Sequence, residues 1–94
     1  MNIAEIKNKL IPLLTRYKIK KAGVFGSYAK GNQNLESDID ILVELGTKIS
    51  LLDFVAIKQE IEKLLEKKID LVEYQALKPR LRNRILSEEI RIYG

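Results

Sequence analysis

Two carboxylates stand two residues apart within one short apolar run of this chain. Asp38 and Asp40 alternate with Ile39, Ile41 and Val43, which is the pattern of a β-strand whose side chains point to opposite faces in turn. Both acids therefore point to the same face, where like charges repel each other and are costly to bury. A divalent cation held between the two carboxylates would remove this cost.

A turn of small residues precedes this run. It reads Gly26-Ser27-Tyr28-Ala29-Lys30-Gly31. Its glycines allow the backbone to approach a ligand closely, and amides at the start of a helix attract phosphate. The hydroxyl of Ser27 adds a hydrogen-bond donor, and the ammonium of Lys30 would neutralise phosphate charge. Together with the acids, the turn predicts a site for a nucleotide, with Gly26, Ser27 and Lys30 on its phosphates.

A third acid interrupts a later apolar segment. Asp70 lies between Ile69 and Leu71. If this segment pairs beside the strand that carries Asp38 and Asp40, three carboxylates converge on one face. Asp70 would then complete a second metal site and help to deprotonate an attacking hydroxyl, as two-metal phosphoryl transfer requires. The alternative for Asp70 is an acid at the end of a strand that simply faces water.

The composition narrows the chemistry further. The chain has 94 residues, a net charge of +4, no Cys and no His. Disulfides, thiolate zinc sites and catalysis by Cys or His are therefore excluded, and any metal must be held by oxygen. Oxygen ligands favour Mg²⁺, with two ions expected, or Mn²⁺ in its place. The length fits one domain, residues 1–94.

The sequence also limits the location and the partners of the protein. No apolar run approaches the ~20 residues that cross a bilayer, and the first residues lack the apolar centre of a signal peptide. We therefore expect a cytoplasmic protein without a membrane partner. The modest positive charge suits a nucleotide or an acidic partner. No segment has the pattern of a recognition helix, so direct DNA binding is not expected.

Hydrophobic periodicity predicts an α/β fold. Apolar residues at helical spacing indicate helices over residues 3–17 and 51–65, and Pro79 opens a last helix through about Glu89. Pro12 predicts a bend or a boundary in the first helix. Strands are predicted over residues 19–25, 38–44 and 69–74. We expect a small mixed sheet with helices packed on one face and the metal site on the other.

These motifs together resemble the polymerase-beta-type nucleotidyltransferase superfamily. The resemblance rests on the Gly26-Ser27 turn, the Asp38-Ile39-Asp40 strand and the lone Asp70, and it covers almost the whole chain. Within the superfamily, the chain is similar to the minimal nucleotidyltransferases, the MntA-like antitoxins usually encoded beside HEPN-domain proteins. Lys30 stands where many relatives carry Arg, so the positive charge is kept but the planar bidentate fork is lost.

The resemblance implies a nucleotidyltransferase fold and a Mg²⁺-dependent protein adenylyltransferase. AMP from ATP, or a nucleotide from another NTP, would pass to a tyrosine hydroxyl of a cognate HEPN-type ribonuclease toxin. This chain would be the antitoxin of a type VII toxin–antitoxin pair. Gly26 and Ser27 would bind the triphosphate, Asp38 and Asp40 the metal, and Asp70 would be the third catalytic carboxylate. Larger relatives add a second domain for the acceptor, so here another protein, or a second copy in a homo-oligomer, would hold it.

Three alternatives stay open at this point. A non-catalytic antitoxin would neutralise the toxin by binding alone, although a complete set of three acids argues against this. Transfer to a small molecule or to an RNA end is disfavoured because an acceptor domain is missing. The basic run from Lys78 to Arg84 is explained equally well by a solvated helix face and by a contact with nucleotide, RNA or an acidic partner. Within it, Arg80 and Arg84 share a helix face that Arg82 does not.

Overall fold

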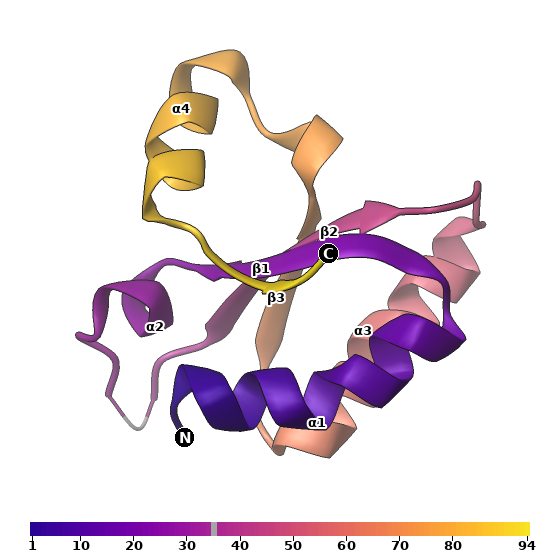
Figure 1. Cartoon of the computed structure of the whole chain (residues 1–94), viewed down its shortest axis with the longest axis horizontal. Coiled ribbons are helices and arrows are strands. Elements are labelled where there is room, and N and C mark those ends of the chain that lie inside the picture. Colours follow the sequence, from indigo (N-terminus) through magenta and orange to yellow (C-terminus); the bar gives the residue numbers. More distant parts are fainter. Residues whose placement is uncertain (35) are drawn as a thin grey trace.

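The computed structural model describes residues 1–34 and 36–94. Within them, helices and strands alternate along most of the chain (Figure 1). The elements are α1 (Ile3–Arg16), β1 (Ile19–Phe25), α2 (Ser27–Lys30), β2 (Ile39–Leu45), α3 (Leu51–Leu65), β3 (Ile69–Glu73), the 3₁₀ helix η1 (Tyr74–Ala76), α4 (Pro79–Glu88) and β4 (Ile90–Tyr93). The three long helices and the three strands that periodicity predicts are confirmed, with bounds that differ by at most one residue.

The strands form one mixed sheet in the order β3-β2-β1-β4. β1 pairs antiparallel with both β2 and β4, whereas β2 and β3 are parallel and α3 connects them. A parallel pair needs such a crossover because the chain must return to the same end of the sheet. The mixed sheet is as predicted, and it makes β3 an edge strand beside the strand that carries Asp40.

Two elements differ from the prediction. The chain does not end on a helix: Ile90–Tyr93 forms β4 and pairs with Ala22, Gly23 and Val24 of β1. Four residues are too few for an alternating pattern to indicate a strand. The segment is a strand because its backbone pairs with β1. The predicted turn after β1 contains a single helical turn, α2.

The helices α1 and α3 cover one face of the sheet (Figure 1). Their apolar stripes pack on the strand residues that point to this face, as amphipathic helices do. The fully buried residues of this core include Ile6, Leu10, Leu14, Val24, Ile39, Ile41, Val43 and Ile61. Ile39, Ile41 and Val43 therefore point into the core, which leaves Asp38 and Asp40 for the other face, as predicted.

Helix α1 runs without interruption through Pro12. The predicted boundary at this residue is therefore wrong, whereas a bend there stays a prediction. Pro12 lies on the exposed side of the helix, as does Asn8 four residues earlier, so the carbonyl that loses its partner faces water. Ser50 caps α3 as its spacing predicts, because its hydroxyl accepts a hydrogen bond of 3.1 Å from the amide of Asp53.

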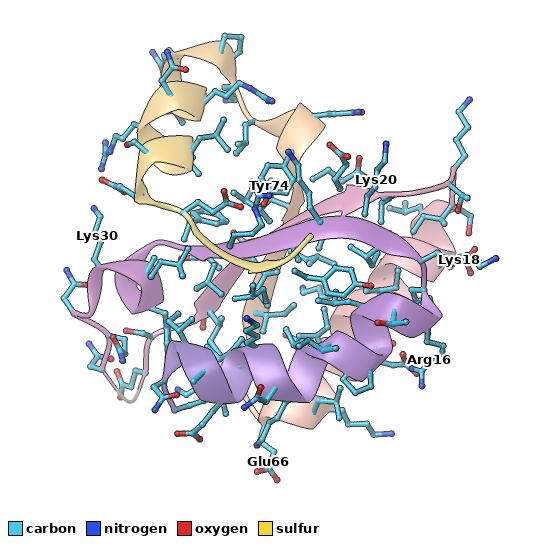
Figure 2. All side chains as sticks on the ribbon, in the orientation of Figure 1. Arg16, Lys18, Lys20, Lys30, Glu66 and Tyr74 are labelled. Atoms are coloured by element: carbon cyan, nitrogen blue, oxygen red, sulfur yellow. The ribbon has the colours of Figure 1, made fainter. Side chains whose placement is uncertain are left out.

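The helix α4 stands on the opposite side of the sheet from α1 and α3 (Figure 1). The buried side chains of Leu42 and Tyr74 lie outside the core under α1 and α3. Figure 2 shows Tyr74 between α4 and the sheet, and Lys30 extending from α2 toward the end of α4. Among the helices of residues 1–34 and 36–94, none has the length and apolarity needed to cross a membrane.

Candidate active site

The register of the parallel strands brings two of the predicted acids side by side. Asp40 of β2 pairs with Asp70 of β3, and Phe25 of β1 lies opposite Asp40 on the other side. Paired residues on neighbouring strands point to the same face. Asp38 directly precedes β2, and its charge also acts on Asp40. The strand pairing on which this cluster depends is therefore present.

The electrostatics of the cluster centre on Asp40. Burial raises the pKa of its carboxyl group above the usual 3.8, and the negative charges of Asp70 and then of Asp38 raise it further. Asp38 and Asp70 are exposed, whereas Asp40 is partly buried between them. All the interactions that shift this pKa disfavour the ionised carboxylate, and a bound cation would stabilise it.

The backbone of Gly26 closes one side of the cluster. Its φ of 72° and ψ of −149° fall in a region that essentially only glycine adopts. A β-carbon at this residue would collide with Oδ2 of Asp40 and would lie 3.1 Å from its Cγ. The glycine is therefore needed both for the shape of the turn and for the space that the Asp40 carboxylate occupies.

The short helix α2 is fixed in place directly after Gly26. Tyr28 is buried in the main core. Gly31 ends the helix in the left-handed conformation, where its amide donates to the carbonyl of Ser27. The first amides of α2 have no acceptor within the helix, so they stay available beside Asp40. The fold thus presents the Gly26-Ser27 turn to the same point as the carboxylates.

Lys30 lies at the far end of α2. Its ammonium is 3.4 Å from a carboxylate oxygen of Glu88 in α4, and both side chains are partly exposed. The pair joins α2 to the end of α4, as Figure 2 shows for the direction of Lys30. Binding of phosphate by Lys30 stays a prediction, because this contact engages it with an acid.

Lys67 is a cation near the site that the sequence analysis missed. Its Nζ lies 3.5 Å from the carbonyl oxygen of Ser37, which precedes Asp38, and 6.0 Å from the ring centroid of Tyr28. It therefore links the end of α3 to the segment that carries the first acid. The sequence shows only that Lys67 belongs to a pair of lysines after a helix. This position does not predict its contacts with Ser37 and Tyr28.

The described residues could hold a hard divalent cation only together with further ligands from substrate phosphates and water. No group of three Asp, Glu, His or Cys side chains among residues 1–34 and 36–94 is arranged to hold a metal by itself. Mg²⁺, however, is usually held by one or two carboxylates, with substrate phosphates and water as its remaining ligands. Asp40 with one neighbouring acid satisfies this requirement, and a cation would offset the burial and the neighbouring negative charges that disfavour ionised Asp40.

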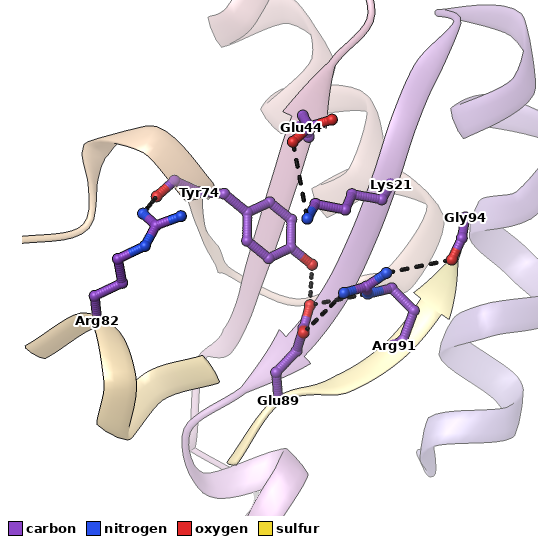
Figure 3. A network of polar contacts seen from close by, with 7 residues as sticks. All are labelled: Lys21, Glu44, Tyr74, Arg82, Glu89, Arg91 and Gly94. Carbon is purple, nitrogen blue, oxygen red and sulfur yellow. Dashed lines mark hydrogen bonds and ion pairs between the residues drawn. The ribbon is translucent and has the colours of Figure 1, made fainter. Parts of the chain in front are cut away.

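A second polar network lies on the same face of the sheet (Figure 3). The hydroxyl of Tyr74 donates to the carboxylate of Glu89, whose side chain is only 6% exposed and lies 3.3 Å from Nε of Arg91. The ammonium of Lys21 lies 4.5 Å from the Tyr74 ring centroid. A β-carbon at Gly23 would lie 2.6 Å from Cγ and Cδ of Glu89. This network anchors the junction of α4 and β4 to the sheet.

Nothing in the local sequence predicts this network. Tyr74 is buried on the α4 side of the sheet, with charged neighbours. Gly23 lies beside Leu42 in the sheet, two residues from Asp40, so Glu89 and the acids share one face. The partners are distant in sequence, and no local pattern connects them.

Comparisons with known proteins agree with this geometry. Residues 8–94 match the family profile described as polymerase beta, nucleotidyltransferase. A candidate protein adenylyltransferase of Methanocaldococcus jannaschii is 50% identical over 90 residues, which are 96% of this chain and 97% of that protein. Protein adenylyltransferase MntA of Thermococcus cleftensis is 37% identical over 78 residues, 83% of this chain and 79% of that protein.

Solved structures show the same architecture. A candidate minimal nucleotidyltransferase superposes with a TM-score of 0.81 at 33% identity, covering 96% of this chain and 95% of that one. A chain of a toxin–antitoxin crystallised with AMP-PNP gives a TM-score of 0.81 at 28% identity, covering 94% of this chain and 73% of that one. On its fold, its motifs and these relatives, the chain belongs to the polymerase beta nucleotidyltransferase family and, within it, to the minimal nucleotidyltransferases.

Proposed function

We propose that this chain transfers AMP from ATP to a tyrosine hydroxyl of a HEPN-type ribonuclease toxin and thereby acts as its antitoxin. The observation that carries this proposal is the pairing of Asp40 with Asp70 beside the backbone of Gly26. Relatives named as protein adenylyltransferases support the reaction. The related toxin–antitoxin crystallised with AMP-PNP supports the nucleotide and the kind of partner.

Each predicted residue has a role in this proposal. Asp38 and Asp40 hold the divalent cation, with Mg²⁺ as the first choice, Mn²⁺ as the alternative and two ions in the complete site. The cation, when bound, neutralises phosphate charge and supports the attacking and leaving oxygens. Gly26 and Ser27 orient the β- and γ-phosphates through the free amides of α2 and the Ser27 hydroxyl. Lys30 contributes positive charge near the phosphates.

The proposed step is an in-line displacement at the α-phosphorus. The acceptor oxygen forms a bond to this phosphorus while the bond from the phosphorus to the bridging oxygen of the β-phosphate breaks. The electron pair of that bond leaves with pyrophosphate. Asp70 takes the proton of the acceptor hydroxyl and later gives it to water. Nothing is oxidised or reduced, and the products are the AMP ester and pyrophosphate.

The position of Asp70 suits an acceptor on a separate protein. It lies on β3, an edge strand of the sheet, and it is exposed. A hydroxyl carried by a partner can therefore reach Asp70 without entering a closed cavity. An exposed acid also exchanges its proton with water readily, as a base that acts in each turnover must.

Intact-mass spectrometry of the toxin candidate tests the proposal. The protein encoded beside this chain, which the proposal expects to carry a HEPN domain, is incubated with the chain, ATP and Mg²⁺, and an Asp38→Ala/Asp40→Ala variant serves as the control. A gain of one or more adenylate masses, absent with the control, is the expected result, and fragmentation then locates the modified tyrosine. A stable complex without a mass gain for any of the four NTPs contradicts transfer and favours an antitoxin that acts by binding alone. Modification of an RNA end or a small molecule in its place contradicts the proposed acceptor.

A further inference from the structure

We propose that α4 is the docking helix for the acceptor protein and that Arg80, Leu81 and Arg84 bind an acidic surface of that protein. This inference rests on the proposed function, because it names the surface by which the acceptor reaches the site. The partner chemistry is an acidic protein surface with an apolar contact at its centre.

The packing of α4 differs from that of the other long helices. Helix α1 buries four residues and α3 buries three, whereas α4 buries none. Its apolar residue Leu81 is 39% exposed, and Leu77, Ile85 and Leu86 are only partly covered. Helices in proteins are stabilised chiefly by packing of an apolar face. Helix α4 therefore keeps apolar surface at Leu81 that contact with a partner would cover.

The positive charge of α4 and of Lys78 before it favours a partner with an acidic surface. Four cations lie between residues 78 and 84, and no acid lies between Glu73 and Glu88. Arg82 is used within the fold, because its Nη1 donates to the carbonyl oxygen of Tyr74 at 2.7 Å. The side chains of Lys78, Arg80 and Arg84 make no hydrogen bond or ion pair with residues 1–34 or 36–94.

The two remaining arginines of α4 stand on one face. Arg80 and Arg84 are one helical turn apart, where like charges repel each other by a few tenths of a kcal/mol. Both side chains are exposed. An acidic surface would remove this repulsion and would pair with both guanidinium groups at once.

The position of α4 links this surface to the site. The pair Lys30–Glu88 joins the end of α4 to α2, and Glu89 anchors the following residue on the face that carries Asp40. A protein bound along α4 therefore lies beside the phosphate turn and the carboxylates. This is where an acceptor hydroxyl must arrive.

A protein surface suits α4 better than RNA does. Leu81 lies between the two arginines and is exposed. Interfaces between proteins are enriched in Arg and have an apolar centre.

A competing apolar surface lies at the start of α3. Leu51 is 78% exposed and Leu52 is 81% exposed. Because α3 follows the end of β2 that is remote from Asp40, a partner bound there would sit far from the carboxylates. This surface provides the alternative outcome of the test.

Charge reversal on α4 tests the inference with the full chain. The variant Arg80→Glu/Arg84→Glu is compared with Lys7→Glu/Lys9→Glu, which makes the same charge change on the exposed side of α1. Binding to the toxin candidate encoded beside this chain is followed by biolayer interferometry. At about 50 mM salt, we expect the α4 variant to associate at least about tenfold more slowly than the wild-type chain, and the difference to shrink toward 1 M salt. The α1 variant should associate like the wild-type chain, apart from a small uniform change.

Further measurements keep the outcomes distinct. A second variant is Arg80→Ala/Arg84→Ala, in which alanine favours the helix. It should retain the circular dichroism spectrum and the ATP affinity of the wild-type chain but transfer AMP more slowly. Equal association for the wild-type chain and both arginine variants overturns the docking helix. A loss of association found only for Leu51→Asp/Leu52→Asp also overturns it. The docking helix is likewise overturned if the arginine variants lose only the binding of a fluorescent RNA oligonucleotide. If the wild-type chain modifies no acceptor, the proposed function fails. If it does so and the arginine variants do so equally fast, only the docking helix fails.

Discussion

The backbone of Gly26 lies directly against the carboxylate of Asp40. A β-carbon at residue 26 would collide with Oδ2 of that carboxylate, and the φ of 72° is one that residues with side chains rarely adopt. The turn after β1 and the acid of β2 are thus fitted to each other. In the proposed function, this contact sets the phosphates and the cation at a fixed separation.

Replacing Gly26 with Ala should therefore damage both stability and activity. The conformation alone costs about 1–3 kcal/mol for a residue other than glycine, and the methyl group would also displace Asp40. We expect the urea midpoint to fall and AMP transfer to be lost even at temperatures where the variant is folded. Chemical denaturation and the mass assay measure the two effects separately.

Gly31→Ala is the matched control for this change. Its φ is 76°, but a β-carbon there meets nothing within 4 Å. The variant should lose about 1–2 kcal/mol through backbone conformation alone and retain transfer when folded. Equal losses of transfer in the two folded variants would show that the contact between Gly26 and Asp40 is not needed.

The raised pKa of Asp40 predicts a pH-dependent cost to folding. Burial and the charges of Asp70 and Asp38 favour the protonated form in the folded chain. The contribution of this group to stability is therefore fully present below the usual carboxyl pKa of 3.8 and is lost as the pH rises through the raised value. At neutral pH, the ionised carboxylate thus destabilises the fold.

Asp40→Asn should remove this cost while abolishing transfer. At pH 7, the variant should be more stable than the wild-type chain by about 0.2–1 kcal/mol, the size of typical side-chain pair energies between neighbouring strands, because burial and the neighbouring acids no longer oppose a charge at residue 40. The gain should shrink as the pH falls toward 3.8. Urea denaturation at several pH values measures it, with Asp53→Asn on the exposed start of α3 as the control. A gain that is the same at every pH would contradict the electrostatic origin.

The regular elements could be predicted because each carries its own pattern. Helix α1 has apolar residues at helical spacing, and acids and isoleucines alternate from Asp38 to Ile41 at the start of β2. Since the same alternation sets the direction of side chains, it also predicted the common face of Asp38 and Asp40. Pairing of Asp70 with Asp40 needed only the usual parallel crossover through α3.

The features that were missed depend on contacts between distant segments. Strand β4 is stabilised by pairing with β1, and four residues give no periodicity of their own. The space that Gly23 leaves for Glu89 joins residues 66 positions apart in the sequence. Glycine in a strand indicates a close approach, but it does not name the side chain that approaches.

Lys30 should affect nucleotide binding more than stability. Its pair with Glu88 is partly exposed, and such pairs contribute about 0–1 kcal/mol. Lys30→Ala should raise the KM for ATP about tenfold, which corresponds to the loss of one charge-assisted hydrogen bond. Lys30→Arg should retain a KM near that of the wild-type chain, because the charge remains and the fork can bind phosphate.

Glu88→Gln separates the two possible roles of Lys30. This change removes the ion pair but leaves the ammonium in place. If Lys30 binds phosphate, the KM for ATP stays constant or falls, because the lysine no longer has a competing acid. If Lys30 acts only by joining α2 to α4, Glu88→Gln and Lys30→Ala raise the KM equally, and the assignment to phosphate is wrong.

The bond between Tyr74 and Glu89 should stabilise the fold more than other tyrosine contacts. The Glu89 side chain is 6% exposed, so removal of the Tyr74 hydroxyl leaves a nearly buried carboxylate with one donor fewer. Tyr74→Phe should lower the free energy of unfolding by about 1.5–3 kcal/mol, as for a hydrogen bond to a charged group.

Tyr93→Phe is the control, because its hydroxyl contacts Thr15 at 3.1 Å in an exposed position. Its loss should lower the free energy of unfolding by less than about 1 kcal/mol. In a double-mutant cycle with Glu89→Gln, the loss from Tyr74→Phe should shrink, because the partner charge is gone. Equal losses for Tyr74→Phe and Tyr93→Phe, with strictly additive effects in the cycle, would show that α4 and β4 are held to the sheet by other contacts.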